Sequence, residues 1–207
     1  MIKEYITLSG TKITEQQALE WHEFKINYID GLSMTVKEEQ HFISQELDFI
    51  RYIINSDEDE TVVFDDLKNK CSQFEILSIE VTGNYIVETA SLFSLAVSPL
   101  PLRSKAVFHR NDPRHFICLQ TLDPESLAPV LEKTKKYRYS IDEDGEIYAG
   151  IEFLYNKAGL LETAIDKTSD PENQQNWKYY DDSDFQNLQN RFTIDISYYR
   201  SADLLPE

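Results

Sequence analysis

The residues best suited to acid–base or anion-binding chemistry lie together between positions 109 and 115. This segment contains His109, Arg110, Asp112, Arg114 and His115. Histidine can transfer protons near neutral pH, and arginine can hold a phosphate or carboxylate through two parallel hydrogen bonds. No nucleophile and no glycine-rich phosphate loop accompanies them. The alternative interpretation, which we favour, is that the segment is simply the turn between two strands.

Other reactive residue types are present, but their spacing does not fit a known site. His41 lacks the helical spacing of a zinc-binding pair, and the turn at 142–145 lacks the later ligands of a calcium loop. Cys71 and Cys118 are the only cysteines and are far apart in the chain, which fits neither a zinc site nor a disulfide framework. We therefore expect no catalytic residue, no metal and no cofactor.

The charge balance indicates which partners the surface suits. The chain has 207 residues, with 37 acidic and 20 basic side chains and a net charge of −17. Nucleic acid and anionic membranes would be repelled by most of such a surface, whereas a basic protein would be attracted to it. The alternative is that the acidic charge only keeps the protein soluble.

The acidic residues are concentrated in two segments. Residues 38–66 contain ten acidic residues and one basic residue, and residues 139–184 contain twelve acidic and three basic residues. Residues 103–138, between them, carry eight basic and four acidic residues. This pattern favours a protein with acidic binding surfaces and one basic island.

Aromatic residues lie next to the second acidic segment. Trp177, Tyr179 and Tyr180 come directly before Asp181 and Asp182. Aromatic anchors surrounded by charge are typical of tight protein interfaces, although the same rings could instead face the core. The predicted partner-binding residues are Asp57, Glu58, Asp59, Glu60, Asp142, Glu143, Asp144, Trp177, Tyr179, Tyr180, Asp181, Asp182 and Asp184.

The clearest structural pattern is the stretch from Tyr137 to Asp166. Three runs of strand-forming residues are separated by turns at Asp142–Gly145 and Asn156–Gly159. Each turn opens with Asp or Asn and closes with Gly, which adopts positive φ without strain. The stretch therefore predicts a three-stranded antiparallel meander.

Two earlier stretches predict helices. Thr14 with Gln17 has the capping-box spacing and is followed by apolar residues three and four apart to about Ile29. A second such stretch runs from Thr35 to Ile54. We expect an α+β fold, with an N-terminal helix pair packed on a largely antiparallel sheet and a C-terminal β-meander. We expect one domain over residues 1–207, with a weak subdivision near 98–102.

Two functional hypotheses follow, from different classes. The first is an acidic cytoplasmic inhibitor that neutralises a basic toxin, such as a nuclease, by direct binding. In its general character the chain is similar to bacterial immunity proteins and antitoxins. The alternative is an enzyme or small-ligand protein that acts on an anionic substrate through the 109–115 loop. The cytoplasmic assignment is an expectation from the two cysteines and from an N-terminus unlike a signal peptide.

Overall fold

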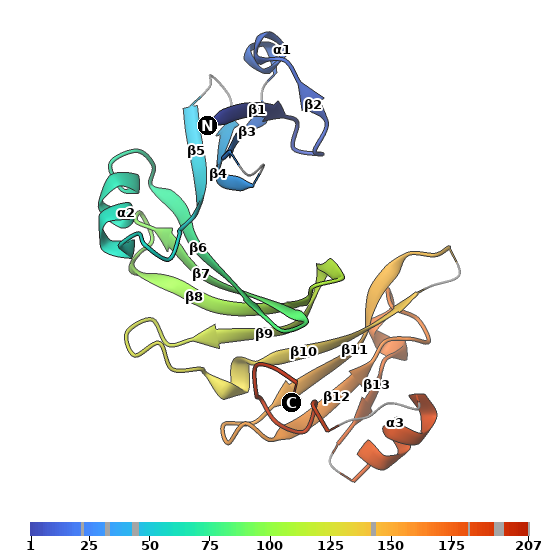
Figure 1. Ribbon diagram of the computed structural model, residues 1–207. Helices are drawn as coiled ribbons and strands as arrows, with labels where there is room; N and C mark the ends of the chain where they lie inside the picture. The colour runs from blue at the N-terminus through green and yellow to red at the C-terminus, as the bar shows by residue number, and fades with distance from the viewer. Residues whose placement is uncertain are drawn as a thin grey trace. The chain divides into compact units, whose positions relative to one another are not determined.

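The computed structural model describes residues 1–21, 23–31, 34–42, 46–141, 144–181, 183–192 and 197–206. Across these ranges, thirteen strands form one mixed sheet in the order β13-β12-β11-β10-β9-β8-β7-β6-β5-β4-β3-β1-β2 (Figure 1). The chain divides into two compact units. Unit 1 comprises Met1–Ile79 and Glu88–Arg103, and unit 2 comprises Glu80–Val87 and Ser104–Glu207.

The elements of unit 1 come from the first part of the chain. They are β1 (Ile2–Ile6), β2 (Lys12–Ile13), α1 (Glu15–Glu20), β3 (Phe24–Ile29), β4 (Thr35–Phe42), β5 (Glu46–Ile53) and α2 (Glu60–Leu67). Three longer strands contribute residues to both units: β6 (Gln73–Thr82), β7 (Tyr85–Ser94) and β8 (Ser98–His109).

The remaining elements belong to unit 2. They are β9 (Asp112–Leu122), the 3-10 turn η2 (Leu131–Lys133), β10 (Lys135–Ile141), β11 (Ile147–Tyr155), β12 (Leu161–Asp166), the 3-10 turn η3 (Gln174–Asn176), β13 (Lys178–Tyr180) and α3 (Phe185–Phe192).

Strand pairing in unit 1 changes direction once. β1 pairs with β2 and β3, β3 with β4, and β4 with β5, all in antiparallel register. β5 and β6 instead pair in parallel, with Ile50 opposite Phe74. Parallel neighbours need a crossover connection, and α2 provides it.

Each helix of unit 1 covers an apolar patch of the sheet. Ala18 of α1 is buried against Phe24 and Ile26 of β3. Leu67 of α2 belongs to a second core that contains Ile50, Phe74 and Phe93. The rings of Phe74 and Phe93 lie in contact. Burial of apolar side chains of this size contributes about 1.5–3 kcal/mol each.

Unit 2 also has two apolar clusters. In the larger, Phe185 and Leu188 of α3 pack on a face of β11 and β12 that includes Ile151, Phe153 and Ala164. Side chains alternate between the two faces of a strand, and residues 164 and 166 of β12 are buried whereas 163 and 165 beside them are only partly buried. The smaller cluster is built from Val87, Val107 and Cys118.

The predicted α+β fold with an N-terminal helix pair is wrong, because the described residues form mainly one mixed sheet with three short helices. Only Glu15–Glu20 of the first stretch is helical, and Phe24–Ile29 is a strand; Thr35–Phe42 and Glu46–Ile53 are also strands. The capping box at Thr14 is present, but it starts a helix of six residues. Beyond it, β-branched and aromatic residues dominate, and both the 3.6-residue and the two-residue period fit their spacing.

The C-terminal meander is confirmed. β10 pairs with β11, and β11 with β12, both antiparallel. Gly145 and Gly159 have φ of 86° and 75°, which is the left-handed region expected at the end of each turn. The β10–β11 register shifts after Arg138, and the β11–β12 register shifts after Leu154.

The proline-containing segment 98–102 forms the beginning of β8. Proline is compatible with the first residues of a strand, where no ladder donor is lost. The expectation of a single domain stays a prediction. In the part of the chain that the structure describes, no helix is long and apolar enough to cross a membrane.

Candidate protein-binding surface

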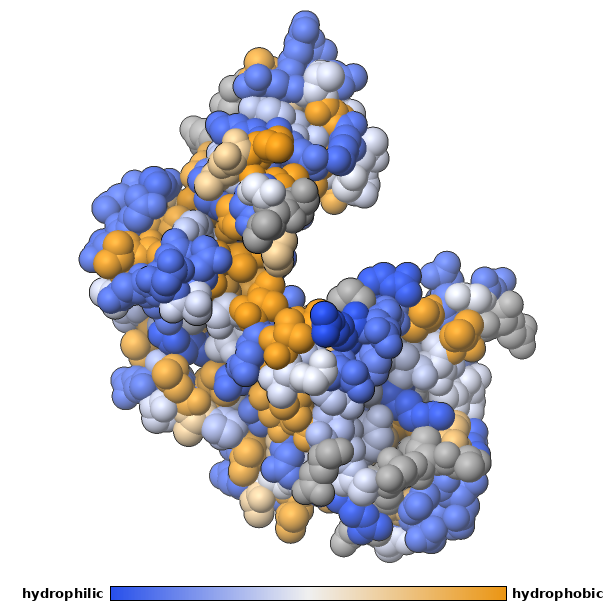
Figure 2. Space-filling model, viewed as in Figure 1, coloured by the Kyte–Doolittle hydropathy of each residue, from blue (hydrophilic) through white to orange (hydrophobic). Residues whose placement is uncertain are grey.

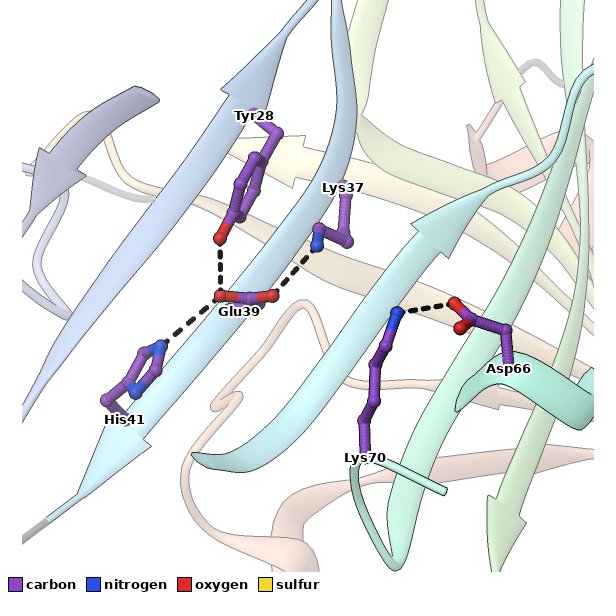
Figure 3. A network of polar contacts seen from close by, with 6 residues as sticks. All are labelled: Tyr28, Lys37, Glu39, His41, Asp66 and Lys70. Carbon is purple, nitrogen blue, oxygen red and sulfur yellow. Dashed lines mark hydrogen bonds and ion pairs between the residues drawn. The ribbon is translucent and has the colours of Figure 1, made fainter. Parts of the chain in front are cut away.

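The most densely connected polar cluster of unit 1 lies on β3 and β4 (Figure 3). The Glu39 carboxylate accepts hydrogen bonds from the Tyr28 hydroxyl at 2.6 Å and from the Lys37 amine at 2.8 Å. The His41 imidazole lies 3.5 Å from the same carboxylate. Residues 37, 39 and 41 share a face because strand side chains alternate.

The electrostatics of this cluster are those of a compensated ionic network. Burial would raise the pKa of Glu39, but the hydrogen bonds from Lys37 and Tyr28 hold it below its ordinary value. Burial, together with the bond to Glu39, raises the pKa of the Tyr28 hydroxyl. The Lys37 amine also lies 3.9 Å from the centre of the Tyr28 ring. We interpret this cluster as one that holds β3 and β4 together.

The His/Arg segment at 109–115 is the tip of the β8–β9 hairpin. Asp112 accepts a hydrogen bond from Arg114 Nε at 3.1 Å and lies 3.2 Å from His115 Nδ1. These two contacts hold the pKa of Asp112 below its ordinary value. His109 Nδ1 accepts a hydrogen bond from the Asn111 backbone. Arg114 and His115 therefore already share a carboxylate within the hairpin.

The acidic loop before α2 is largely engaged within unit 1. Glu58 accepts hydrogen bonds from the Tyr52 hydroxyl at 2.6 Å and from the backbone of Asn55. Asp59 is the N-cap of α2. Glu60 lies 3.4 Å from Arg103. Their assignment to a partner interface stays a prediction, and their intramolecular bonds give them a structural role.

Three of the predicted partner-binding residues lie outside the described residues. These are Asp142, Glu143 and Asp182. Asp144 is exposed in the turn that ends at Gly145.

The aromatic residues of the second acidic segment lie on or beside β13, at one end of the sheet order. Tyr179 pairs with Ile165 of β12, and its side chain is 55% exposed. The Trp177 indole donates to the Asp170 carbonyl at 3.1 Å, and Lys167 lies 4.5 Å from its ring. Tyr179 is therefore the aromatic residue of this group that is most available to a partner.

A hollow of about 860 Å³ lies in unit 2 beside the first turn of α3. It is lined by Asn156, Leu160, Leu161, Glu162, Asp181, Ser183, Phe185 and Arg200. Asp181 accepts hydrogen bonds from the Ser183 hydroxyl and backbone, which hold the pKa of its carboxyl below the ordinary value. Glu162 is exposed and has no ion pair within the described part of the chain.

We call the β13 residues and this hollow the edge surface. It contains the predicted residues Tyr179, Tyr180 and Asp181, whereas Asp184 lies directly before α3 and Asp57 and its neighbours belong to unit 1. Hydrophilic residues dominate the visible face over α3, as they do over α2 (Figure 2).

Sequence reasoning missed two charged residues of the edge surface, Glu162 and Arg200. Glu162 could have been recognised as a charged residue within the third strand of the predicted meander. Arg200 gave no signal, because its place depends on a backbone contact from Leu161 N–H to the Arg200 carbonyl at 3.0 Å.

Comparisons of this chain with protein-family models, with curated proteins and with solved structures found no match.

Proposed function

We propose that this chain is a cytoplasmic acidic binding protein that neutralises a basic protein partner, in the manner of immunity proteins and antitoxins. The observation that carries the proposal is the composition of the edge surface. An exposed tyrosine on the terminal strand lies in the same unit as two exposed carboxylates, Glu162 and Asp181, that line one hollow. Exposed rings with charged neighbours are the usual ingredients of a salt-sensitive interface.

The electrostatic argument supports the sign of the partner. With a net charge of −17, the chain repels acidic surfaces and steers basic ones toward it. Arg200 is the cation among the residues that line the hollow, so the two carboxylates outnumber it. A cationic patch on the partner would complete this charge balance.

The alternative function, at the His/Arg hairpin tip, has less support. Asp112 already lies between Arg114 and His115, so an anionic substrate would have to displace a carboxylate held by both. No observation among the described residues adds a nucleophile beside them.

Co-expression provides the test. If a gene next to this one encodes a basic domain, that domain is expressed with and without this chain, and growth is followed. The association rate of the purified pair is then measured by stopped flow at low and physiological salt. Steered association reaches about 10⁸ M⁻¹s⁻¹ at low salt and falls as ions screen it. Absence of both rescue and complex would reject the proposal.

A further inference from the structure

A second hollow, of about 570 Å³, lies in unit 1 between the turn after β1 and the end of α1. It is lined by Thr7, Leu8, Ser9, Glu20, Trp21 and Glu23. Its walls are mainly apolar, and among the described residues that line it the acidic side chains are Glu20 and Glu23, with no lysine or arginine. We call this feature the Trp21 hollow.

Trp21 is exposed because of how α1 ends. Ala18 is the residue of this short helix that is buried in the core, and the helix stops when Trp21 takes an extended conformation as C-cap. The Trp21 side chain is left 51% exposed, and Leu8 across the hollow is 42% exposed. Large apolar side chains gathered at the surface beside polar groups are characteristic of binding sites.

The two carboxylates of the hollow are not used elsewhere in the described part of the chain. Glu20 and Glu23 are exposed and form no ion pair or hydrogen bond there. Nearby acids differ: Glu15 accepts a hydrogen bond from Tyr5 at 2.7 Å, and Glu4 pairs with Lys12. Lys12, a neighbouring cation, is therefore already engaged.

The hydroxyl groups of the hollow are also engaged. Thr7 Oγ1 and Ser9 Oγ lie 2.8 Å apart, and the Thr11 backbone N–H donates to Thr7 Oγ1 at 3.1 Å. The recognition groups left to a ligand are consequently one indole ring and two carboxylates. This set is complementary to a cation that has a flat or apolar surface.

We propose that the Trp21 hollow binds an arginine side chain, with the guanidinium against the Trp21 ring and within reach of Glu20 and Glu23. Tryptophan is the strongest cation–π acceptor among the aromatic residues, and arginine both stacks on rings and bonds carboxylates through its planar fork. That this arginine belongs to the basic partner rests on the proposed function. The cation site itself does not.

The chain offers a direct spectroscopic test because it contains only two tryptophans. In the Trp177→Phe variant, emission reports on Trp21 alone. Hexa-arginine is titrated into this variant at low salt. We expect a saturable change in emission, and weaker binding of hexa-lysine. In Trp21→Phe, which retains Trp177, the emission change should be absent.

The role of Glu20 and Glu23 is tested by comparing two double variants that remove the same net charge. Glu20→Gln with Glu23→Gln, in the Trp177→Phe background, should weaken hexa-arginine binding by about tenfold. Glu125→Gln with Glu132→Gln removes the same net charge from exposed sites in unit 2 and should leave the affinity within about twofold. Circular dichroism checks that each variant is folded.

Three results would overturn the inference: no peptide binding, binding without a change in Trp21 emission, or equal weakening by both glutamine pairs. The last would mean that diffuse charge alone attracts the peptide. The proposed function fails separately. If the adjoining gene's domain neither binds nor is neutralised while hexa-arginine still perturbs Trp21, the function is rejected and the cation site stands. If Trp21→Ala leaves partner affinity unchanged, the partner's arginine does not occupy the hollow.

Discussion

Lys136 is fully buried, and its amine donates a hydrogen bond to the Tyr198 carbonyl at 2.5 Å while lying 3.5 Å from the centre of the Tyr198 ring. Burial lowers the pKa of the amine to about 8, although the neighbouring Cys118 opposes this effect. The Tyr155 hydroxyl donates to the next carbonyl, that of Tyr199, at 3.0 Å. Two buried side chains thus fasten residues 198 and 199 to the sheet.

The buried lysine predicts a specific pH dependence of stability. Between the folded pKa of about 8 and the ordinary value of 10.5, the unfolded chain binds more protons than the folded chain. Stability from this group therefore rises with pH in that interval. Cys118 and Cys71 act oppositely as the pH approaches and passes 9, because burial raises the pKa of both thiols, that of Cys118 from 9.0 to about 11. The lysine effect is therefore clearest between pH 8 and 9.

Replacing the lysine checks this assignment. The thermal unfolding midpoint of the wild-type chain should be higher at pH 9 than at pH 8. Lys136→Met should remove this difference. Lys133→Met, an exposed position on η2, is the control and should retain it. An unchanged pH profile in Lys136→Met would contradict the prediction.

Glu152 should be a major ionic contact of unit 2. It is 8% exposed and accepts hydrogen bonds from Lys135 and Lys167, each at 2.8 Å. Glu152→Gln leaves these amines without their anion and should lower the free energy of unfolding by about 2 kcal/mol. Glu162→Gln, exposed on the next strand, should change it by less than about 0.5 kcal/mol in denaturant titration.

Glu152 also predicts acid sensitivity. Burial would raise its pKa, but the bonds from Lys135 and Lys167 keep it below 4.5. A carboxyl with a lowered folded pKa stabilises above its unfolded value and loses that contribution as pH falls through the folded pKa. The stability difference between wild type and Glu152→Gln should therefore shrink below pH 4.5. A difference that stays constant would show that the charge is not responsible.

Two turn glycines allow backbone strain to be separated from crowding. Gly159 and Gly145 both have positive φ, but a Cβ on Gly159 would lie 3.1 Å from Leu131 Cδ1, whereas one on Gly145 meets nothing within 4 Å. Gly145→Ala should destabilise by about 1 kcal/mol through strain alone. Gly159→Ala should cost more, and Gly159→Val up to about 3 kcal/mol. Equal losses in the two alanine variants would exclude the contact.

Asp57 and Glu58 should separate association from folding. Asp57 is exposed, whereas Glu58 accepts a hydrogen bond from the Tyr52 hydroxyl. Burial, together with this hydrogen bond, raises the pKa of the Tyr52 hydroxyl to about 12. Glu58→Gln should lower stability by about 1 kcal/mol. Asp57→Asn should leave the melting temperature unchanged and only slow association with a basic partner. A melting temperature unchanged in both variants would remove the structural role of Glu58.

The sequence predicted the local turns better than the N-terminal elements. At Gly145 and Gly159 a single residue type decides the backbone conformation, so the meander could be placed. Between Phe24 and Ile53 no glycine or proline pattern separates helix from strand, because Gly31 is as compatible with the end of a helix as with the connection between β3 and β4. There, pairing with the neighbouring strands decides the structure, and the spacing of apolar residues within one stretch does not reveal that pairing.

The candidate site was likewise predicted only in part from the sequence. The aromatic group at 177–180 was recognised because its members are adjacent in sequence. Glu162 joins Asp181 only through the pairing of β12 with β13 and the start of α3. The Trp21 hollow was missed because the expected helix continues to about Ile29, whereas α1 ends at Glu20.

The near-sequential order of the strands has a consequence for how the chain folds. From β3 to β13 the strand order follows the chain order, so each strand from β4 onward lies beside its immediate predecessor. Loop closure then spans short stretches of chain, and contact order is low for a protein built mainly from strands. Folding can extend from one hairpin to the next as the chain leaves the ribosome, and no early strand has to wait for a partner made at the end of synthesis.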